Sequence, residues 1–180
     1  MDYYSYSAGR HIEAMEAGHS FRCDGPNGAV RILIFEDTVD HIRDAVAACE
    51  SAGVSVSVST NLQEAMDCFE GEEPGKMRPW AGIISDIYMP EMGFGNQSIS
   101  PLVPGGVPVA LAAEALGVPF VHCTSGYHHG DQYNWICDLG RQRGWPQMVD
   151  VPSEREGGSK DWPKAIQVLL GLIAQRNGAG

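Results

Sequence analysis

Short apolar runs alternate with segments of helical periodicity over most of this sequence. Residues 30–35 are apolar except for Arg31, as expected of a strand that is buried on both faces of a sheet. Residues 38–52 carry apolar side chains three and four positions apart, the spacing of an amphipathic helix, and Gly53 follows as a stop signal. A strand and a helix joined in this way form the basic unit of an α/β fold.

The same alternation recurs along the rest of the chain. Further strands are predicted over residues 54–58, 80–85, 118–123 and 148–151. Further helices are predicted over residues 61–69, 107–116, 131–143 and 162–175. The alternation predicts a doubly wound α/β fold, with a five-stranded parallel sheet and helices on both of its faces.

The length and the flanking segments indicate how the chain is organised. A chain of 180 residues suits a single hydrophobic core. Residues 1–28 are predicted to be an N-terminal extension that is partly disordered, because turn-forming residues at 24–28 separate them from the first strand. Residues 29–176 are predicted to form the folded domain, and residues 177–180 a frayed tail.

The charge balance argues against two classes of partner. The chain has 12 Lys and Arg against 23 Asp and Glu, a formal net charge of −11. A surface this acidic repels nucleic-acid phosphates and anionic membranes, so we expect neither as a partner. No apolar run is long enough to span a bilayer, and the five cysteines include no C-x-x-C pair that would indicate a zinc knuckle. We therefore expect a cytoplasmic protein.

Oxygen-bearing side chains follow three of the predicted strands. Glu36 and Asp37 come after the first strand, Asp86 after the third and Thr124 after the fourth. Because ligands of such sheets bind beyond the carboxyl ends of the strands, we expect these side chains to converge. Three carboxylates in one place require a cation, and their hard oxygen ligands favour Mg²⁺. With Mg²⁺ present, Asp86 could attack a phosphoryl group and Thr124 could donate a hydrogen bond to it.

Three stretches of sequence resemble a known family. They are Ile34-Phe35-Glu36-Asp37, Asp86-Ile87-Tyr88-Met89-Pro90-Glu91-Met92-Gly93 and Val121-His122-Cys123-Thr124-Ser125. Through them, residues 30–175 resemble the CheY-like receiver domain of bacterial response regulators. The resemblance implies a flavodoxin-like strand order of 2-1-3-4-5 and a receiver-like domain over residues 29–176.

The resemblance also implies residue roles. Asp86 looks like the phosphoacceptor, and Thr124 looks like the hydroxyl that follows the phosphoryl group in switching. The implied metal ligands are Glu36, Asp37, Asp86 and the backbone carbonyl of Tyr88, with Mg²⁺ as the cofactor.

Three features depart from the pattern of the family. Receiver domains usually carry a Lys before a Pro at the end of the fifth strand, where this chain has Val151-Pro152. Lys160, in the loop that follows, is the predicted substitute as phosphate partner, and Lys164 is the weaker alternative. Met148 stands where an aromatic switch residue is expected. Residues 93–105 are an insertion, and the sequence leaves open whether it is a lid or a partner-binding loop.

Potential metal ligands also cluster near the fourth strand. They are His122, Cys123, His128, His129 and Asp131. Their spacing matches no zinc pattern, so a structural or surface role is predicted for them.

Two functions from different classes remain open. In the first, a histidine kinase or phosphotransfer protein phosphorylates Asp86, and the altered surface binds an unknown downstream protein. In the second, a degenerate pseudo-receiver acts as a phosphorylation-independent interaction module, which the missing strand-five lysine favours. No output domain follows the last predicted helix, so a protein–protein contact is the expected output.

We do not expect an enzyme in either case, beyond Mg²⁺-dependent self-phosphorylation and autodephosphorylation. A hydrolase that forms an aspartyl phosphate needs a second acid just downstream of its nucleophile. Ile87 and Tyr88 follow Asp86 instead, which argues against that third option.

Overall fold

The computed structural model describes residues 21–23, 30–70, 80–92, 101–126, 131–150 and 159–178. The strands are β1 (Phe21–Cys23), β2 (Arg31–Phe35), β3 (Ser55–Ser59), β4 (Gly82–Ser85), β5 (Met89–Pro90), β6 (Leu102–Val103) and β7 (Phe120–His122). The helices are α2 (Val39–Ser51), α3 (Leu62–Asp67), α4 (Gly106–Leu116), α5 (Asp131–Arg143) and α6 (Trp162–Gly178).

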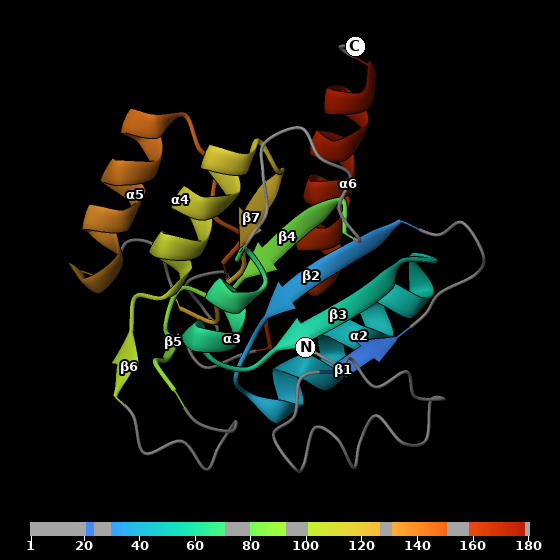
Figure 1. Ribbon diagram of the computed structural model, residues 1–180, viewed down its shortest axis with the longest axis horizontal. Helices are drawn as coiled ribbons and strands as arrows, with labels where there is room; N and C mark the ends of the chain where they lie inside the picture. Colours follow the sequence, from blue (N-terminus) through green and yellow to red (C-terminus); the bar gives the residue numbers. More distant parts are fainter. Residues whose placement is uncertain are drawn as a thin grey trace.

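A parallel sheet forms the centre of the molecule (Figure 1). β2 lies between β3 and β4, β7 lies beyond β4, and these four strands run parallel. The predicted α/β class and the order of the first four parallel strands are therefore confirmed. The winding of the chain reverses between β2 and β4, which makes their carboxyl ends the expected place for a ligand.

The predicted fifth strand over residues 148–151 is reduced to a single parallel bridge between Cys123 and Val149. The N–H of Val149 donates to the carbonyl of His122, and its carbonyl accepts from the N–H of Thr124. The prolines on either side of this segment have no N–H with which to extend the ladder. The segment thus lies beside β7, as a fifth strand would, without forming one among the described residues.

Two strand pairings were not predicted from the sequence. β1, inside the predicted extension over residues 1–28, pairs antiparallel with β3 at the edge of the sheet. β5 and β6 form a separate antiparallel ribbon, and β6 lies inside the predicted insertion over residues 93–105. All three strands are too short to show an alternating pattern. The remainder of the extension lies outside the described residues, so its disorder stays a prediction.

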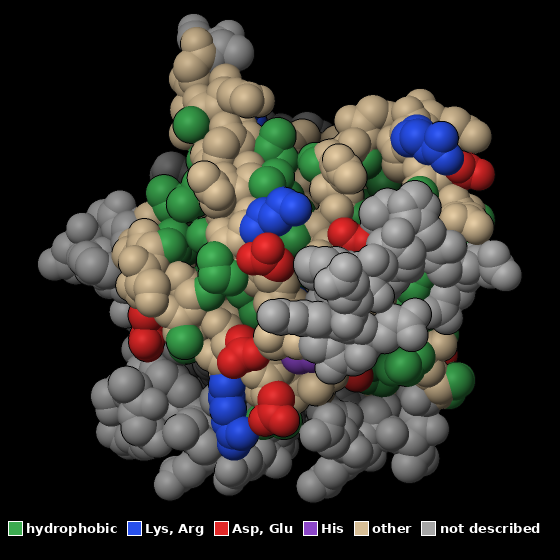
Figure 2. All heavy atoms as spheres, turned by 180° about the vertical axis from the view of Figure 1, so that it is seen from behind, with side chains coloured by type: hydrophobic (Ala, Val, Ile, Leu, Met, Phe, Trp, Pro, Cys, Tyr) green, Lys and Arg blue, Asp and Glu red, His purple; other side chains and the backbone are tan. Residues whose placement is uncertain are grey.

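Helices cover both faces of the sheet, as predicted. Ile32 and Ile34 of β2 point to one face and Leu33 and Phe35 to the other, and all four are fully buried. α2 and α6 pack on the first face, and α3 and α4 pack on the second (Figure 1). Figure 2 shows the molecule from the side of α2 and α6, where acidic side chains are more frequent than basic ones among the described residues.

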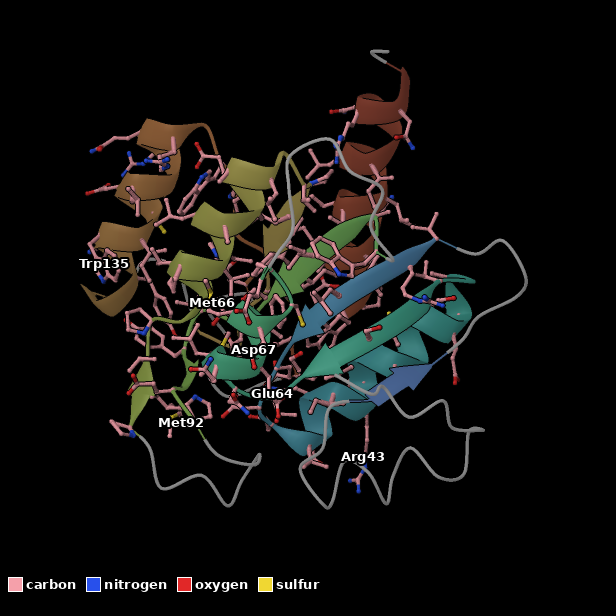
Figure 3. All side chains as sticks on the ribbon, in the orientation of Figure 1. Arg43, Glu64, Met66, Asp67, Met92 and Trp135 are labelled. Carbon is pink, nitrogen blue, oxygen red and sulfur yellow. The ribbon has the colours of Figure 1, made fainter. Side chains whose placement is uncertain are left out.

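Local signals start α3 where the sequence predicts. The Oδ1 atom of Asn61 accepts a hydrogen bond from the N–H of Glu64 at 3.0 Å, which satisfies a donor of the first helical turn. The carboxylate of Glu64 in turn accepts from the N–H of Thr60 at 3.2 Å; Figure 3 labels Glu64 on α3, near the end of β3. The two bonds fix α3 against the carboxyl end of the sheet.

The last helix is longer than the sequence predicts. α6 runs to Gly178, past the predicted end at residue 175 and into the predicted tail over residues 177–180. Among the described residues, no helix combines the length and the apolar character needed to cross a membrane.

The first residue of α4 lies directly against the backbone at the end of β4. A Cβ atom at Gly106 would come within 2.4 Å of the Asp86 carbonyl oxygen and 2.9 Å of the Ile87 Cα. The N–H of Gly106 donates to the Ile87 carbonyl at 3.0 Å, and its carbonyl accepts from Nε2 of His122 at 3.0 Å. Only glycine permits this approach, because the atoms that a side chain would meet are backbone atoms.

The substitution Gly106→Ala is expected to lower the free energy of unfolding by about 2 to 3 kcal/mol, because overpacking forces the ends of β4 and α4 apart. Gly171→Ala is the matched control. No atom lies within 4 Å of a Cβ at Gly171, and alanine inside a helix is favoured over glycine by roughly 0.5 to 1 kcal/mol. Urea unfolding followed by circular dichroism measures both. If Gly106→Ala left the free energy of unfolding unchanged, the close packing of α4 on β4 would be contradicted.

Candidate functional site

Three carboxylates gather beyond the carboxyl ends of two neighbouring strands. Glu36 and Asp37 follow β2, and Asp86 follows β4. The last residues of these strands, Phe35 and Ser85, are direct partners in the sheet. One oxygen atom from each carboxylate lies within 4.8 Å of the other two. The predicted convergence of the three acids is therefore confirmed.

The protein itself engages both oxygens of the Glu36 carboxylate. Oε1 accepts a hydrogen bond from the N–H of Thr38 at 3.0 Å, and Nδ1 of His41 lies 3.5 Å from the same oxygen. Oε2 is ion-paired with the ammonium of Lys160. Glu36 is almost fully buried, so it anchors Lys160, while the other two carboxylates are the more accessible ones.

Lys160 reaches the site from the short segment that precedes α6. Its ammonium lies 2.7 Å from Oδ2 of Asp86 and is ion-paired with Glu36, and its side chain is fully buried. The ring of Trp162, the first residue of α6, lies 5.7 Å from Nζ. The sequence suggested Lys160 as a lysine from a loop, and the structure has its ammonium inside the acidic cluster. Lys164, the weaker alternative, is exposed on the first turn of α6.

Burial and charge set the proton affinities of these groups. Burial raises the pKa of Asp37 to about 6, and the charge of Glu36 adds to the rise. Burial also raises the pKa of Asp86 to about 6, although the charge of Lys160 opposes it. Burial would raise the pKa of Glu36 as well, but Lys160 and His41 bring it below its usual value. The site at neutral pH therefore holds three ionised carboxylates and one ammonium.

This donor set fits a divalent cation. Three carboxylates against one ammonium leave an excess of negative charge in a place that is largely shielded from water, which is costly without a counterion. The raised pKa values of Asp37 and Asp86 express that cost. Carboxylate oxygens are the ligands that Mg²⁺ prefers, and Asp37 and Asp86 are the partly accessible members of the cluster.

Thr124 and Tyr88 lie next to this cluster in the fold. β7 pairs with β4, so Thr124 follows the strand beside the one that Asp86 follows. The Thr124 side chain is buried, and its Oγ1 accepts the N–H of Gly126 at 3.1 Å, which leaves the hydroxyl proton to donate. The ring of Tyr88 packs edge-on against Tyr133, with centroids 5.7 Å apart. The hydroxyl and carbonyl roles of Thr124 and Tyr88 stay predictions.

Sequence reasoning missed His41 as a neighbour of the acidic cluster. It lies in the first turn of α2, where no motif marks it, and its proximity to Glu36 depends on the angle at which α2 leaves β2. Met148, which stands where an aromatic residue was expected, packs beside Ile87 and Tyr133. An aromatic side chain thus reaches this region from α5 rather than from the segment after it.

The predicted structural role of His122 agrees with its surroundings, since the ring is buried and bonded to Gly106. His128 and His129 lie outside the described residues.

Solved structures with a similar fold include receiver domains. A response regulator receiver domain protein (CheY-like) from Methanospirillum hungatei JF-1 matches with a TM-score of 0.58 at 14% sequence identity, over 85% of this chain and 100% of that chain. A response regulator receiver protein from Sinorhizobium medicae WSM419 matches with a TM-score of 0.52 at 18% identity, over 83% and 98%. The chain therefore has the CheY-like receiver fold that its motifs resemble, at low sequence identity.

Fold similarity alone does not assign chemistry to this chain. A de novo designed Rossmann 2x3 fold protein also matches, with a TM-score of 0.50 at 13% identity, over 78% of this chain and 89% of that chain. No protein-family model matches the sequence, and no curated protein matches it significantly. Function has to be inferred from the acidic cluster and its lysine.

Lys160→Met is expected to lower the free energy of unfolding at pH 7 by about 3 kcal/mol, because it leaves buried carboxylates without their cation. Lys164→Met is the matched control and should change it by less than about 0.5 kcal/mol. The loss of unfolding free energy in Lys160→Met should become smaller as the pH falls, because the carboxyls that have lost their partner then take up protons. Urea unfolding at several pH values measures this. A deficit equal to that of the control would contradict the ion pairs.

The affinity for Mg²⁺ is expected to fall as the pH drops below about 6. Asp37 and Asp86 have pKa values of about 6 and are protonated below that pH, so the cation has to displace protons. The dissociation constant should rise by up to about tenfold per pH unit for each proton displaced. Isothermal titration calorimetry from pH 7.5 to 5 measures the trend, and a flat profile would exclude these two carboxylates as ligands.

Proposed function

We propose that this chain is a receiver that accepts a phosphoryl group on Asp86 with Mg²⁺ bound, and that it signals through protein–protein contacts. The single observation that carries the proposal is the buried ammonium of Lys160, 2.7 Å from Asp86 and paired with Glu36. The proposed donor is a histidine kinase or phosphotransfer protein in the cytoplasm, and the proposed acceptor of the signal is a downstream protein.

The contacts of Asp86 support a role as nucleophile. One carboxylate oxygen, Oδ1, accepts the N–H of Ile87 at 2.7 Å, which fixes the orientation of the group. Its pKa of about 6 leaves it ionised at neutral pH. In the proposed step, an Asp86 oxygen attacks the phosphorus of a phosphohistidine, the P–N bond breaks, and the imidazole leaves.

The surrounding residues support stabilisation of the transferred group. Lys160 is held by Glu36, so its ammonium is already in position to pair with a phosphoryl oxygen on Asp86. Asp37 and Asp86, with the carbonyl of Tyr88, are the proposed ligands of Mg²⁺, which when bound supplies positive charge for the phosphoryl oxygens. The proton of the Thr124 hydroxyl is the proposed third contact.

A second candidate is the degenerate pseudo-receiver that acts without phosphorylation. Met148 in place of an aromatic residue favours it. The missing strand-five lysine, which favoured it at the level of sequence, weighs less, because Lys160 contacts both Asp86 and Glu36.

Incubation with Mg²⁺ and acetyl phosphate, followed by intact-mass measurement, separates the two candidates. The receiver is expected to gain one phosphoryl group on the wild type and none on Asp86→Asn, because the amide is not a nucleophile. Lys160→Met should slow the gain by at least about tenfold, through the lost charge-assisted contact, while Lys164→Met should leave it unchanged.

Beryllofluoride, which mimics a phosphoryl group, gives an independent readout. The wild type should show a rise in thermal midpoint with Mg²⁺ and beryllofluoride together, and Asp86→Asn should show none. If the folded wild type gains no mass and shows no shift, the pseudo-receiver is correct and the phosphoacceptor role is excluded.

A further inference from the structure

A cavity of about 450 Å³ lies between α5 and the segment that follows it, and none of the three acidic residues lines it. Its volume is within the range of small-molecule sites. The lining includes His122 of β7 and the segment residues Trp145 and Gln147, and α5 contributes Asn134, Cys137 and Arg141. Several polar side chains and the aromatic rings of His122 and Trp145 thus line one cavity, as is usual for a small-molecule binding site.

His122 offers this cavity a hydrogen-bond acceptor. Its Nε2 lies 3.0 Å from the carbonyl of Gly106, and because a carbonyl only accepts, Nε2 carries the proton. Burial lowers the pKa of His122, more than the bond to Gly106 raises it, so the ring is neutral at pH 7. Nδ1 is then a lone-pair acceptor, and it has no hydrogen-bond partner among the described residues. Because His122 lines the cavity, this nitrogen is available to accept a hydrogen bond from a donor on a ligand.

Trp145 supplies a rigid flat wall. Its Nε1 donates to Oε2 of Glu114 at 2.9 Å, and Nε of Arg143 donates to the same oxygen at 2.8 Å. Its ring packs edge-on against Phe120 and His122, at centroid distances of 5.4 and 5.8 Å. With its N–H already engaged, the indole of Trp145 presents only ring surface, which suits a planar group.

Arg141 places a positive charge on the lining of the cavity. Its guanidinium is ion-paired with Asp138 one turn earlier on α5, and it has further N–H donors beyond that contact. These donors suit a carboxylate. Trp135, on the same helix, is exposed and projects outward from α5 (Figure 3), so it takes no part in this arrangement.

We propose that the cavity binds a planar heteroaromatic acid. Its ring N–H donates to Nδ1 of His122, its ring lies against Trp145, and its carboxylate pairs with Arg141. The site is distinct from the acidic cluster but connected to it, because His122 holds Gly106 and Gly106 packs on the backbone of Asp86. The inference does not depend on phosphorylation.

Calorimetric titration with indole-3-acetate tests the proposal on the whole protein. Saturable binding is expected, with a dissociation constant on the order of 1 mM or tighter. Two analogues probe the polar contacts. 1-Methylindole-3-acetate lacks the N–H and indole-3-ethanol lacks the carboxylate, and each should bind about tenfold more weakly. Absence of saturable binding, or equal affinity for the three compounds, overturns the proposal.

Variants and a footprint locate the site. Arg141→Met should weaken binding of indole-3-acetate by at least about fivefold while leaving binding of indole-3-ethanol unchanged, because only the carboxylate contact is lost. Arg176→Met, at the exposed end of α6, is the matched control and should leave both unchanged. A weaker affinity for indole-3-acetate in Arg176→Met than in Arg141→Met would contradict the placement.

Indole-3-acetate should also slow alkylation of Cys137 by iodoacetamide, read by peptide mass mapping, because Cys137 lines the cavity. Cys68, which is partly exposed and lies beside Ser59 of β3, a strand that β2 and β4 separate from β7, is the internal control. Protection of both cysteines alike would contradict a local site. Asp86→Asn should bind indole-3-acetate like the wild type, so a failure of phosphorylation and a failure of this proposal remain distinguishable.

Discussion

The ion pairs of one buried lysine hold the centre of this molecule together. Lys160 contacts Glu36 and Asp86, which follow two different strands, while its own backbone leads into α6. Taking charges out of water is costly, and only close opposite charges offset that cost. Glu36 and Asp86 therefore share the ammonium of Lys160 only when β2, β4 and the start of α6 are all in place. Fold and site thus depend on the same few contacts.

The backbone around the cluster is as closely fixed as its charges. Gly106 lies against the backbone of Asp86 and Ile87, and His122 donates to Gly106 from the neighbouring strand. α4, β4 and β7 are thereby joined beside the proposed phosphoacceptor. A change of charge or volume at Asp86 would therefore displace α4 first, and with it the cavity wall that His122 forms.

The sequence predicted those parts of the molecule that depend on local patterns. The strands with long apolar runs and the helices with regular spacing were found, and the rule for parallel sheets brought Glu36, Asp37 and Asp86 together before any coordinates. The short pairs β1–β3 and β5–β6 carry too few residues for a pattern. The contact of His41 with Glu36 depends on a helix orientation, a tertiary property that no local motif records. Lys160 was only one of two candidate lysines, because the position of a residue in the sequence does not show whether a loop brings its side chain to Asp86.

The origin of Lys160 just ahead of α6, rather than on a strand, has a consequence for how such proteins are compared. An electrostatic site requires a charge at a point in space, and the chain can deliver that charge by more than one route. A comparison that matches residues column by column would score the lysine as lost. A comparison of where the ammonium lies would find the charge beside Asp86, whichever segment of the chain carries it.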